Sequence, residues 1–366
     1  MKLSDTVLKY EERVVFALRE LYGSYGYAPF RMSRFEEYDL YVRNKSFLVS
    51  DSVITFTDTD GKLMALKPDV TLSIVKNCRV APGEVEKVYY NENVFRVSRG
   101  THAFREIMQS GLECIGELDS TALAEVVGLA ADSLALVDEG YVLDLSHLGV
   151  VSAVVDALGA PDSIRADLLH ALGEKNPHAI RGLLSTAGIA PERAVPLLTL
   201  VATAGAPADV LARCADVLSD NAAAMAALDE LAAVAAALGD GRRVRIDFSV
   251  IHDMSYYSGI VFRGFVPGVS AAILSGGQYD KLVQKLGRAP GAVGFAVYLD
   301  LLDELRRPSS CEDCDVFLLY GEGDAAERVL DAARRLRSEG ERVRVGRSVP
   351  QKLRVRRIVT LSEVEK

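Results

Sequence analysis

The segment FRVSRGTHAFREIMQSGLECIG, residues 95–116, decides the fold prediction for this chain of 366 residues, because it is typical of one antiparallel hairpin. Its second half places Gln109 and Glu113 an even number of residues apart, so in a strand both side chains lie on one face. Apolar residues flank the pair, and burying two polar groups among them without a partner costs free energy. A bound polar ligand would supply that partner. The alternative is an amphipathic edge hairpin with both side chains in water.

The sequence before this hairpin predicts one helix followed by sheet. Apolar residues recur at helical spacing in residues 4–25, and Gly26 provides a stop. From Tyr27 to Glu117, short β-branched and aromatic runs alternate with turn residues. Asp60-Gly61 lies between two such runs, which is a strong hairpin signal. We therefore expect mostly antiparallel sheet in this region.

The sequence after the hairpin predicts helices first and strands later. Residues 119–138 have helical periodicity, and VLDLSHLGVV is typical of a strand leading into another helix. Residues 150–240 are rich in alanine and leucine, with proline- and asparagine-containing starts, and predict an all-helical insertion. Strand-like sequence returns at Arg242, and a final apolar helix is expected from Ala296 to Leu305.

A change in composition at residues 306–310 indicates a linker to a small C-terminal α/β segment, residues 311–366, with a β-α-β order. The predicted fold class is α+β. One domain comprises residues 1–149 and 241–306, and the helical insertion of residues 150–240 interrupts it. Basic residues concentrate near the C-terminus, where we expect a solvated surface.

Composition indicates a globular protein of the cytoplasm. Hydrophobic residues make up 49% of the chain, no apolar run suggests a membrane span of about 18 residues, and the N-terminus carries charges where a signal peptide is apolar. Five scattered cysteines argue against a disulfide framework. Cys311 and Cys314 have metal-like spacing but lack further ligands, so we expect a loop with two thiols and no metal. The net charge of −9 disfavours broad contact with nucleic acid.

Four segments together resemble the class II aminoacyl-tRNA synthetase catalytic domain and, within that class, histidyl-tRNA synthetase. They are LKPDVT, the hairpin itself, HDMSYYSGIVF and SGGQYDKLVQKLGRAPGAVGFAV. The resemblance covers nearly the whole chain and includes the helical insertion. It implies a class II synthetase-like antiparallel sheet flanked by helices, and residues 311–366 resemble part of the anticodon-binding domain of that family.

The resemblance also implies a histidine pocket. Asp69 and Thr71 match the carboxylate and threonine that hold the α-amino group of histidine, and Gln109 matches the glutamine that assists there. Glu113 and Tyr257 match the acid and the tyrosine that receive the imidazole. A carboxylate and a phenol suit a ring whose two nitrogens donate or accept hydrogen bonds.

The ATP site, by the same matching, has lost part of its charge. Arg96 and Arg105 match two arginines of the phosphate-binding motif and would be its remainder. The catalytic arginine of the synthetases falls on His252, and the motif 3 arginine falls on Leu301. The motif 1 proline falls on Ser33. Losing one transition-state charge contact costs about 3 to 4 kcal/mol, so two losses should abolish adenylation.

A kept amino-acid pocket with a damaged ATP site resembles the regulatory-subunit family of ATP phosphoribosyltransferase. Membership implies a non-catalytic chain without cofactor, which binds L-histidine, mediates feedback inhibition and joins the short-form catalytic subunit. We also expect a homodimer through the synthetase-like core, no membrane, and no tRNA partner. Two alternatives stay open: an active histidyl-tRNA synthetase, in which a protonated His252 replaces one arginine, and an orphan paralogue that binds another amino acid or a nucleic acid.

Several other residues have a structural interpretation. The glycines of residues 276–294 do not have P-loop spacing and predict close backbone packing beside a pocket. His102 and His147 lack partners in the sequence. Tyr256 is expected to face away from Tyr257 on a strand and to serve packing.

Overall fold

The predicted hairpin lies within a nine-stranded sheet of the larger of two compact units, Glu11–Leu305. In the computed structural model, residues 8–44, 53–98, 101–239, 241–251, 256–305 and 312–365 are described. Strands β5 (Val85–Val97) and β6 (Phe104–Gly116) pair antiparallel along their whole length, which confirms the hairpin.

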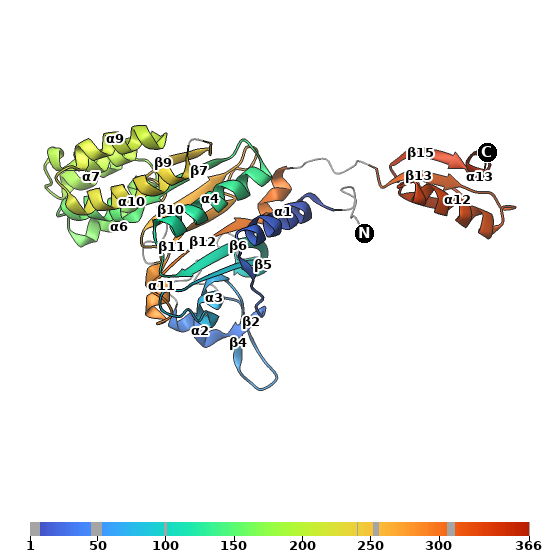
Figure 1. The fold of residues 1–366 in the computed structure, drawn as a ribbon, viewed down its shortest axis with the longest axis horizontal. Helices are drawn as coiled ribbons and strands as arrows, with labels where there is room; N and C mark the ends of the chain where they lie inside the picture. The colour runs from blue at the N-terminus through green and yellow to red at the C-terminus, as the bar shows by residue number, and fades with distance from the viewer. Residues whose placement is uncertain are drawn as a thin grey trace. The chain divides into compact units, whose positions relative to one another are not determined.

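The sheet has the strand order β1-β5-β6-β12-β11-β10-β7-β9-β8 (Figure 1). Two of its pairs, β1 with β5 and β7 with β9, are parallel, and the other pairs are antiparallel, so the sheet is mixed and mostly antiparallel, as predicted. The other bounds are β1 Ala28–Pro29, β7 Val142–His147, β8 Ala204–Gly205, β9 Val244–Asp247, β10 Ile260–Phe265, β11 Leu274–Gln278 and β12 Gly291–Tyr298.

Helices α1 (Tyr10–Ser24) and α4 (Ser120–Val137) form where the apolar periodicity predicted them. The Asp119 carboxylate caps α4 by accepting from the Ala122 N–H at 2.8 Å. By length and composition alone, α4 could cross a membrane, contrary to the expectation that no apolar run is long enough. More than half of α4 is buried inside the protein, where it packs against β10 and β12, as core helices do.

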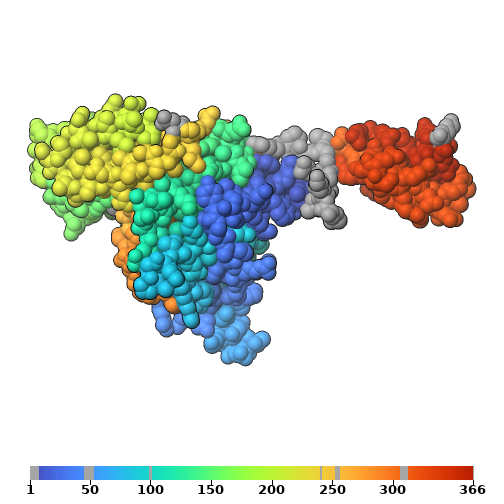
Figure 2. Space-filling model, viewed as in Figure 1, coloured from blue at the N-terminus to red at the C-terminus, as the bar shows by residue number. Residues whose placement is uncertain are grey.

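The helical segment, residues 148–238, lies beside β7 and β9 (Figure 1), and Figure 2 shows it packed against the neighbouring part of the same unit. Helix α10 (Ala222–Leu238) contacts α4, α5 and β7. The Asn221 side chain caps α10, accepting from the Ala224 N–H at 3.1 Å. The other helices of this segment are α5 Leu148–Ala157, α6 Asp162–Gly173, α7 Pro177–Thr186, α8 Val195–Ala202 and α9 Pro207–Leu218.

A second, three-stranded sheet has the order β2-β4-β3, with β2 at Phe35–Glu37, β3 at Thr55–Thr57 and β4 at Leu63–Leu66. The β3–β4 hairpin turns at Asp60-Gly61 as predicted, and the Asp58 carboxylate accepts from the backbone N–H of Lys62 at 2.8 Å.

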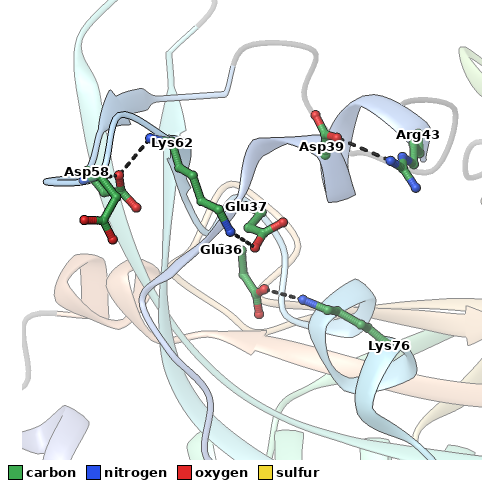
Figure 3. A network of polar contacts seen from close by, with 8 residues as sticks. Glu36, Glu37, Asp39, Arg43, Asp58, Lys62 and Lys76 are labelled. Atoms are coloured by element: carbon green, nitrogen blue, oxygen red, sulfur yellow. Dashed lines mark hydrogen bonds and ion pairs between the residues drawn. The ribbon is translucent and has the colours of Figure 1, made fainter.

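Ion pairs surround this small sheet (Figure 3). Glu36 pairs with Lys76 of α3 (Thr71–Asn77) at 2.8 Å, and Glu37 pairs with Lys62 at 3.0 Å. Asp39 and Arg43 pair within α2 (Tyr38–Arg43). Exposed pairs of this kind contribute little free energy. This small sheet leads into the site, because Asp69 lies between β4 and α3 and Thr71 is the first residue of α3.

The predicted helix from Ala296 to Leu305 is wrong in its first part. Residues 296–298 belong to β12, and a 3₁₀ helix, Leu299–Leu305, follows. Because β12 lies between β6 and β11 and is buried on both faces, its sequence is apolar throughout. Such a run cannot be distinguished from a buried helix by periodicity.

The smaller unit contains a parallel three-stranded sheet with the order β14-β13-β15. Strand β13 (Cys314–Leu319), helix α12 (Ala326–Ser338) and β14 (Val343–Gly346) form the predicted β-α-β unit, and β15 (Val355–Thr360) was not predicted. Cys314 begins β13 and is buried, so it is not in a loop as expected, and Cys311 lies outside the described residues. Most basic residues here pair with acids: Arg342 and Arg356 with Asp315, Arg354 with Asp313, and Arg357 with Glu341.

Candidate functional site

One face of the large sheet brings the predicted residues together. Gln109 and Glu113 of β6 pair with Tyr298 and Gly294 of β12, so all four share one face. On β5, the register places Arg96 on that same face, opposite Arg105. The even spacing of Gln109 and Glu113 therefore had the predicted consequence, and both side chains are buried, at 3% and 2% exposure.

A cavity of about 50 Å³ lies on this face. Besides the strands, its lining includes the segment before α3 with the first residue of α3, the residues before β10 and the residue after β11. Its polar and aromatic lining consists of Asp69, Thr71, Tyr90, Arg96, Gln109, Glu113, Tyr256, Tyr257, Ser275, Tyr279, Phe295 and Tyr298.

The Glu113 carboxylate is held by two hydroxyl groups. Thr71 donates to its Oε1 at 2.7 Å, and Tyr279 donates to its Oε2 at 2.5 Å. Burial raises the pKa of Glu113 to about 8, the charge of Asp69 adds to the rise, and the two hydrogen bonds oppose it. A buried carboxyl of this kind favours a cationic or hydrogen-bonding partner.

Asp69 is the second buried carboxyl of the site. Its Oδ1 accepts from the Leu72 N–H in the first turn of α3, at 2.8 Å. Burial raises the pKa of Asp69, while that hydrogen bond and the charge of Arg96 oppose the rise. The Arg96 Nε donates to the carbonyl oxygen of Pro68 at 3.0 Å, which fixes this arginine beside the Asp69 segment.

Glycines bring the backbone close to the Glu113 carboxylate, as the glycine pattern predicted. A Cβ at Gly294 would overlap Glu113 Oε2, and one at Gly111 would lie 2.5 Å from the Tyr90 hydroxyl. Gly277 similarly leaves room for the Tyr257 ring, whose Cδ1 would lie 2.9 Å from an added Cβ. These strands therefore need glycine where they pass beneath the side chains of the cavity.

The prediction that Tyr256 faces away from Tyr257 is wrong, whereas its predicted role in packing is confirmed, because Tyr256 belongs to a buried hydrophobic cluster. Tyr256 and Tyr257 precede β10 rather than alternate within it, and both line the cavity with their ring centroids 4.6 Å apart. The chain is not extended as a strand there, so the two-residue alternation does not apply.

The structure places Asp69, Thr71, Gln109, Glu113 and Tyr257 around the one cavity, together with Arg96. Arg105 does not join them. It is exposed near the turn of the hairpin, where its charge opposes the rise that burial causes in the pKa of Asp300.

Sequence reasoning missed Tyr279, Tyr90, Ser275 and Tyr298. Tyr279 follows the quoted SGGQ run, and a phenol after a glycine-rich strand was the only signal for it. The Tyr298 hydroxyl is hydrogen-bonded to Ser275 Oγ at 2.8 Å between the neighbouring strands β12 and β11. The sequence alone cannot show this contact.

The positions that replace synthetase residues carry no cation in the described part of the chain. Leu301 lies in the 3₁₀ helix after β12 and is partly buried. Ser33 is exposed, and its hydroxyl accepts from the Phe35 N–H at 3.1 Å. His252 lies outside the described residues. His147 has the structural role that was expected of it, because it is buried, lies 3.3 Å from Glu230 and accepts a hydrogen bond from the Gly149 N–H.

Comparison with known proteins agrees with this geometry. Residues 3–302 match the family model described as histidyl-tRNA synthetase. The ATP phosphoribosyltransferase regulatory subunit of Symbiobacterium thermophilum is 33% identical over 304 residues, which cover 81% of this chain and 76% of that protein. The chain belongs to the histidyl-tRNA synthetase-like family of ATP phosphoribosyltransferase regulatory subunits.

Solved structures of this family share the fold. An ATP phosphoribosyltransferase regulatory subunit/histidyl-tRNA synthetase from Bacillus halodurans superposes with a TM-score of 0.78 at 23% identity, over 98% of this chain and 96% of that one. A chain of the ATP phosphoribosyl transferase (HisG:HisZ) complex from Thermotoga maritima superposes with a TM-score of 0.62 at 18% identity, over 79% and 97%. The predicted class II synthetase-like α+β fold is confirmed.

Proposed function

We propose that this chain is the non-catalytic regulatory subunit of ATP phosphoribosyltransferase in histidine biosynthesis, and that it binds L-histidine and mediates feedback inhibition. The observation that carries the proposal is the Glu113 carboxyl, fully enclosed between Thr71 and Tyr279 and close to Asp69.

The charges of the cavity suit a histidine molecule. Its two carboxyls, Glu113 and Asp69, face a single lining arginine, Arg96. An α-ammonium group would complement Asp69, with Thr71 and Gln109 as further polar partners, and an imidazole N–H would donate to Glu113. Tyr257 would contact the ring. A ligand with one ammonium group and one basic ring therefore compensates both buried acids.

Adenylation is not expected, because the position of the motif 3 arginine holds Leu301. A leucine cannot stabilise the charge that develops on a transferred phosphate. The site therefore supports sensing of an amino acid rather than its activation.

The proposed partner is a short-form catalytic chain of ATP phosphoribosyltransferase, and the names of the relatives support this partner. In such a hetero-oligomer, histidine would bind one conformation better than the other. The coupling between the two sites would then amount to about 1 to 3 kcal/mol.

We also propose a homodimer through the synthetase-like core. Strand β1 covers β5 only at Val88 and Tyr89. A groove of about 600 Å³ follows the remaining edge, past Asn91 and Asn93. An uncovered strand edge favours pairing with another chain.

Titration calorimetry tests the ligand assignment. We expect histidine to bind the purified chain, and Glu113→Ala or Asp69→Ala to weaken binding about 10- to 100-fold, the range for losing one charged hydrogen bond. Lys62→Ala, which removes an exposed ion pair of the small sheet, serves as the control and should leave binding unchanged.

Two further measurements separate the alternatives. ATP-dependent pyrophosphate exchange should be absent, and robust exchange would identify an active synthetase instead. If histidine does not bind, alone or with the catalytic chain, an orphan paralogue with another ligand is the better assignment.

A further inference from the structure

Tyr279 lies between strand β11 and helix α11 (Asp280–Lys285), so it belongs to neither element. Its φ of −136° and ψ of 47° are typical of neither a strand nor a helix. Its hydroxyl nevertheless donates to Glu113 in the cavity, at 2.5 Å. The orientation of Tyr279 therefore depends on what holds its backbone at this junction.

The backbone of Ala292, near the start of β12, provides one such contact. The Tyr279 N–H donates to the Ala292 carbonyl at 2.8 Å. The Ala292 N–H donates to Oδ1 of the Asp280 carboxylate at 2.9 Å. The carbonyl and the N–H of Ala292 thus bind two successive residues of the junction, and the two bonds close a small ring around the Tyr279 backbone.

The second oxygen of the Asp280 carboxylate is held by Ser258, in the chain before β10. The Ser258 hydroxyl donates to Oδ2 at 3.2 Å, and it accepts from the Asp280 N–H at 3.3 Å. The Ser258 N–H donates to the Gln278 carbonyl at 3.0 Å, which anchors Ser258 at the end of β11. Both carboxylate oxygens therefore accept a hydrogen bond, and each bond comes from a different segment of the chain.

Asp280 lies outside the lining of the amino-acid cavity, as do Ser258 and Ala292. Its carboxyl is partly buried beside Gly291, where an added Cβ would lie 3.1 Å from Oδ1. Asp280 is therefore placed to affect a ligand through a neighbour that lines the cavity. Tyr279 precedes it directly in the chain.

We propose that Asp280 is a positioning residue for the amino-acid cavity: its carboxylate joins Ser258 and Ala292 to the junction of β11 and α11, and thereby keeps the Tyr279 hydroxyl on Glu113. Loss of the carboxylate lowers the ligand affinity without removing a group that lines the cavity. The identity of the ligand rests on the proposed function, but the positioning contact does not.

Binding of L-histidine to the full chain provides the first test. Asp280→Ala should weaken binding about tenfold, the effect of losing one hydrogen bond to a charged group. Asp280→Asn keeps an oxygen that accepts from Ala292 and gains an amide that donates to Ser258, so affinity should return to within about threefold of the wild type. Wild-type affinity in Asp280→Ala would overturn the positioning role.

Gln284→Ala is the matched control, because Gln284 also connects α11 to the chain just before β12. Its Nε2 donates to the Pro290 carbonyl at 2.7 Å in an exposed contact. Removing this bond should leave histidine affinity unchanged. A loss in Gln284→Ala equal to that in Asp280→Ala would assign the effect to the attachment of α11 in general and would overturn the role of Asp280.

A double-mutant cycle shows whether Asp280 acts through Tyr279. Tyr279→Phe removes the hydroxyl that the carboxylate positions, so adding Asp280→Ala to this variant should weaken binding by at most about threefold more. A further tenfold loss in that background would mean that the two residues act independently, and it would overturn the proposal.

Hydrogen exchange without ligand distinguishes the positioning contact from the ligand assignment. The Tyr279 amide donates to Ala292 rather than to the carboxylate, so it reports on the junction. It should exchange at least about tenfold faster in Asp280→Ala than in the wild type, with Gln284→Ala unchanged. Equal Tyr279 exchange in Asp280→Ala and the wild type would overturn the proposal. If Tyr279 exchange accelerates but the wild type does not bind histidine, the proposed function fails and the positioning contact stands.

Ser258→Ala replaces Asp280→Ala in these tests if the latter chain does not fold. It removes the hydroxyl that holds Oδ2 and leaves the bond from Ala292 to Oδ1 in place. Histidine binding should then weaken about threefold, and the Tyr279 amide should exchange about threefold faster. Wild-type Tyr279 exchange in a folded Ser258→Ala chain would overturn the proposal.

Discussion

The protonation of Glu113 is determined by two opposed effects, burial and hydrogen bonding. Its full burial disfavours the charged form, whereas the Thr71 and Tyr279 hydroxyls donate to its oxygens and favour it. Burial dominates, and with a pKa of about 8 the carboxyl is mostly protonated at neutral pH. One proton is then available for sharing with a basic ring, so a neutral imidazole could bind without net proton uptake.

The same residue predicts how stability depends on pH. The pKa of Glu113 is about 8 in the folded chain and near 4.5 when unfolded, so between these values the folded state holds the extra proton. Stability therefore falls as pH rises from about 4.5 to 8, at up to about 1.4 kcal/mol per pH unit. Between pH 6 and pH 9, the free energy of unfolding measured with urea should fall less in Glu113→Gln than in the wild type.

Burial raises the pKa of Asp69 as well, so any contribution of Asp69 to the slope has the same sign and is present in both chains. Lys62→Ala, on the exposed small-sheet ion pair, should keep the full wild-type slope. Identical pH dependence in Glu113→Gln and the wild type would show that Glu113 is charged in the folded chain at neutral pH.

Among the strands, the sequence predicted which side chains share a face of one strand, but it did not predict which strands lie side by side in the sheet. The β5–β6 hairpin and the shared face of Gln109 and Glu113 follow from a period of two, so they could be predicted. Asp69 and Thr71 could be predicted as site residues only from the family resemblance, since nothing in the sequence around them indicates that this part of the chain lies beside Glu113 of β6.

Tyr279 and Tyr256 could not be predicted in the same way. Tyr279 is 166 residues from Glu113 in the sequence, and only the order of strands β6, β12 and β11 brings the two together. The continuously apolar β12 was partly mistaken for a helix, because a strand buried on both faces loses the alternation that identifies strands.

Strand β12 and helix α7 offer a contrasting pair of glycines. An alanine at Gly294 would place its Cβ against the Glu113 carboxylate and 2.5 Å from the Leu112 carbonyl oxygen. Gly182, inside α7, has no atom within 4 Å of such a Cβ. We expect Gly294→Ala to destabilise the chain by about 1 to 3 kcal/mol, as overpacking does, and to abolish histidine binding.

Gly182→Ala should instead stabilise the chain by about 1 kcal/mol, the difference between the two residues in a helix, and leave binding unchanged. Thermal unfolding and calorimetry on both variants provide the measurement. Normal histidine affinity in Gly294→Ala would mean that Glu113 does not contact the ligand.

At the scale of the whole molecule, the amino-acid cavity belongs entirely to Glu11–Leu305. The helical segment lies in the same unit. In the proposed homodimer, the part of this unit that faces the second chain is the open edge of β5, which runs from Asn91 toward the tip of the same hairpin that contributes Arg96, Gln109 and Glu113.

The homodimer proposal leads to a test on that edge. The Tyr89 carbonyl accepts from Phe30 N, and Phe95 N donates to the Lys67 carbonyl, so the backbone of the alternate residues 91 and 93 also faces outward. Proline at an outward-facing position removes no bond to the neighbouring strand. Asn93→Pro should therefore keep the fold but block edge pairing.

Sedimentation equilibrium should give twice the chain mass for the wild type and a lower apparent mass for Asn93→Pro, with at least about tenfold weaker self-association. Asn93→Ala keeps the backbone N–H and should remain dimeric. A wild-type dimer that persists unchanged in Asn93→Pro, with circular dichroism confirming the fold, would move the interface away from this edge. A monomeric wild type would contradict the homodimer itself, and a groove with three arginines, Arg19, Arg31 and Arg34, would then be open to an acidic partner chain.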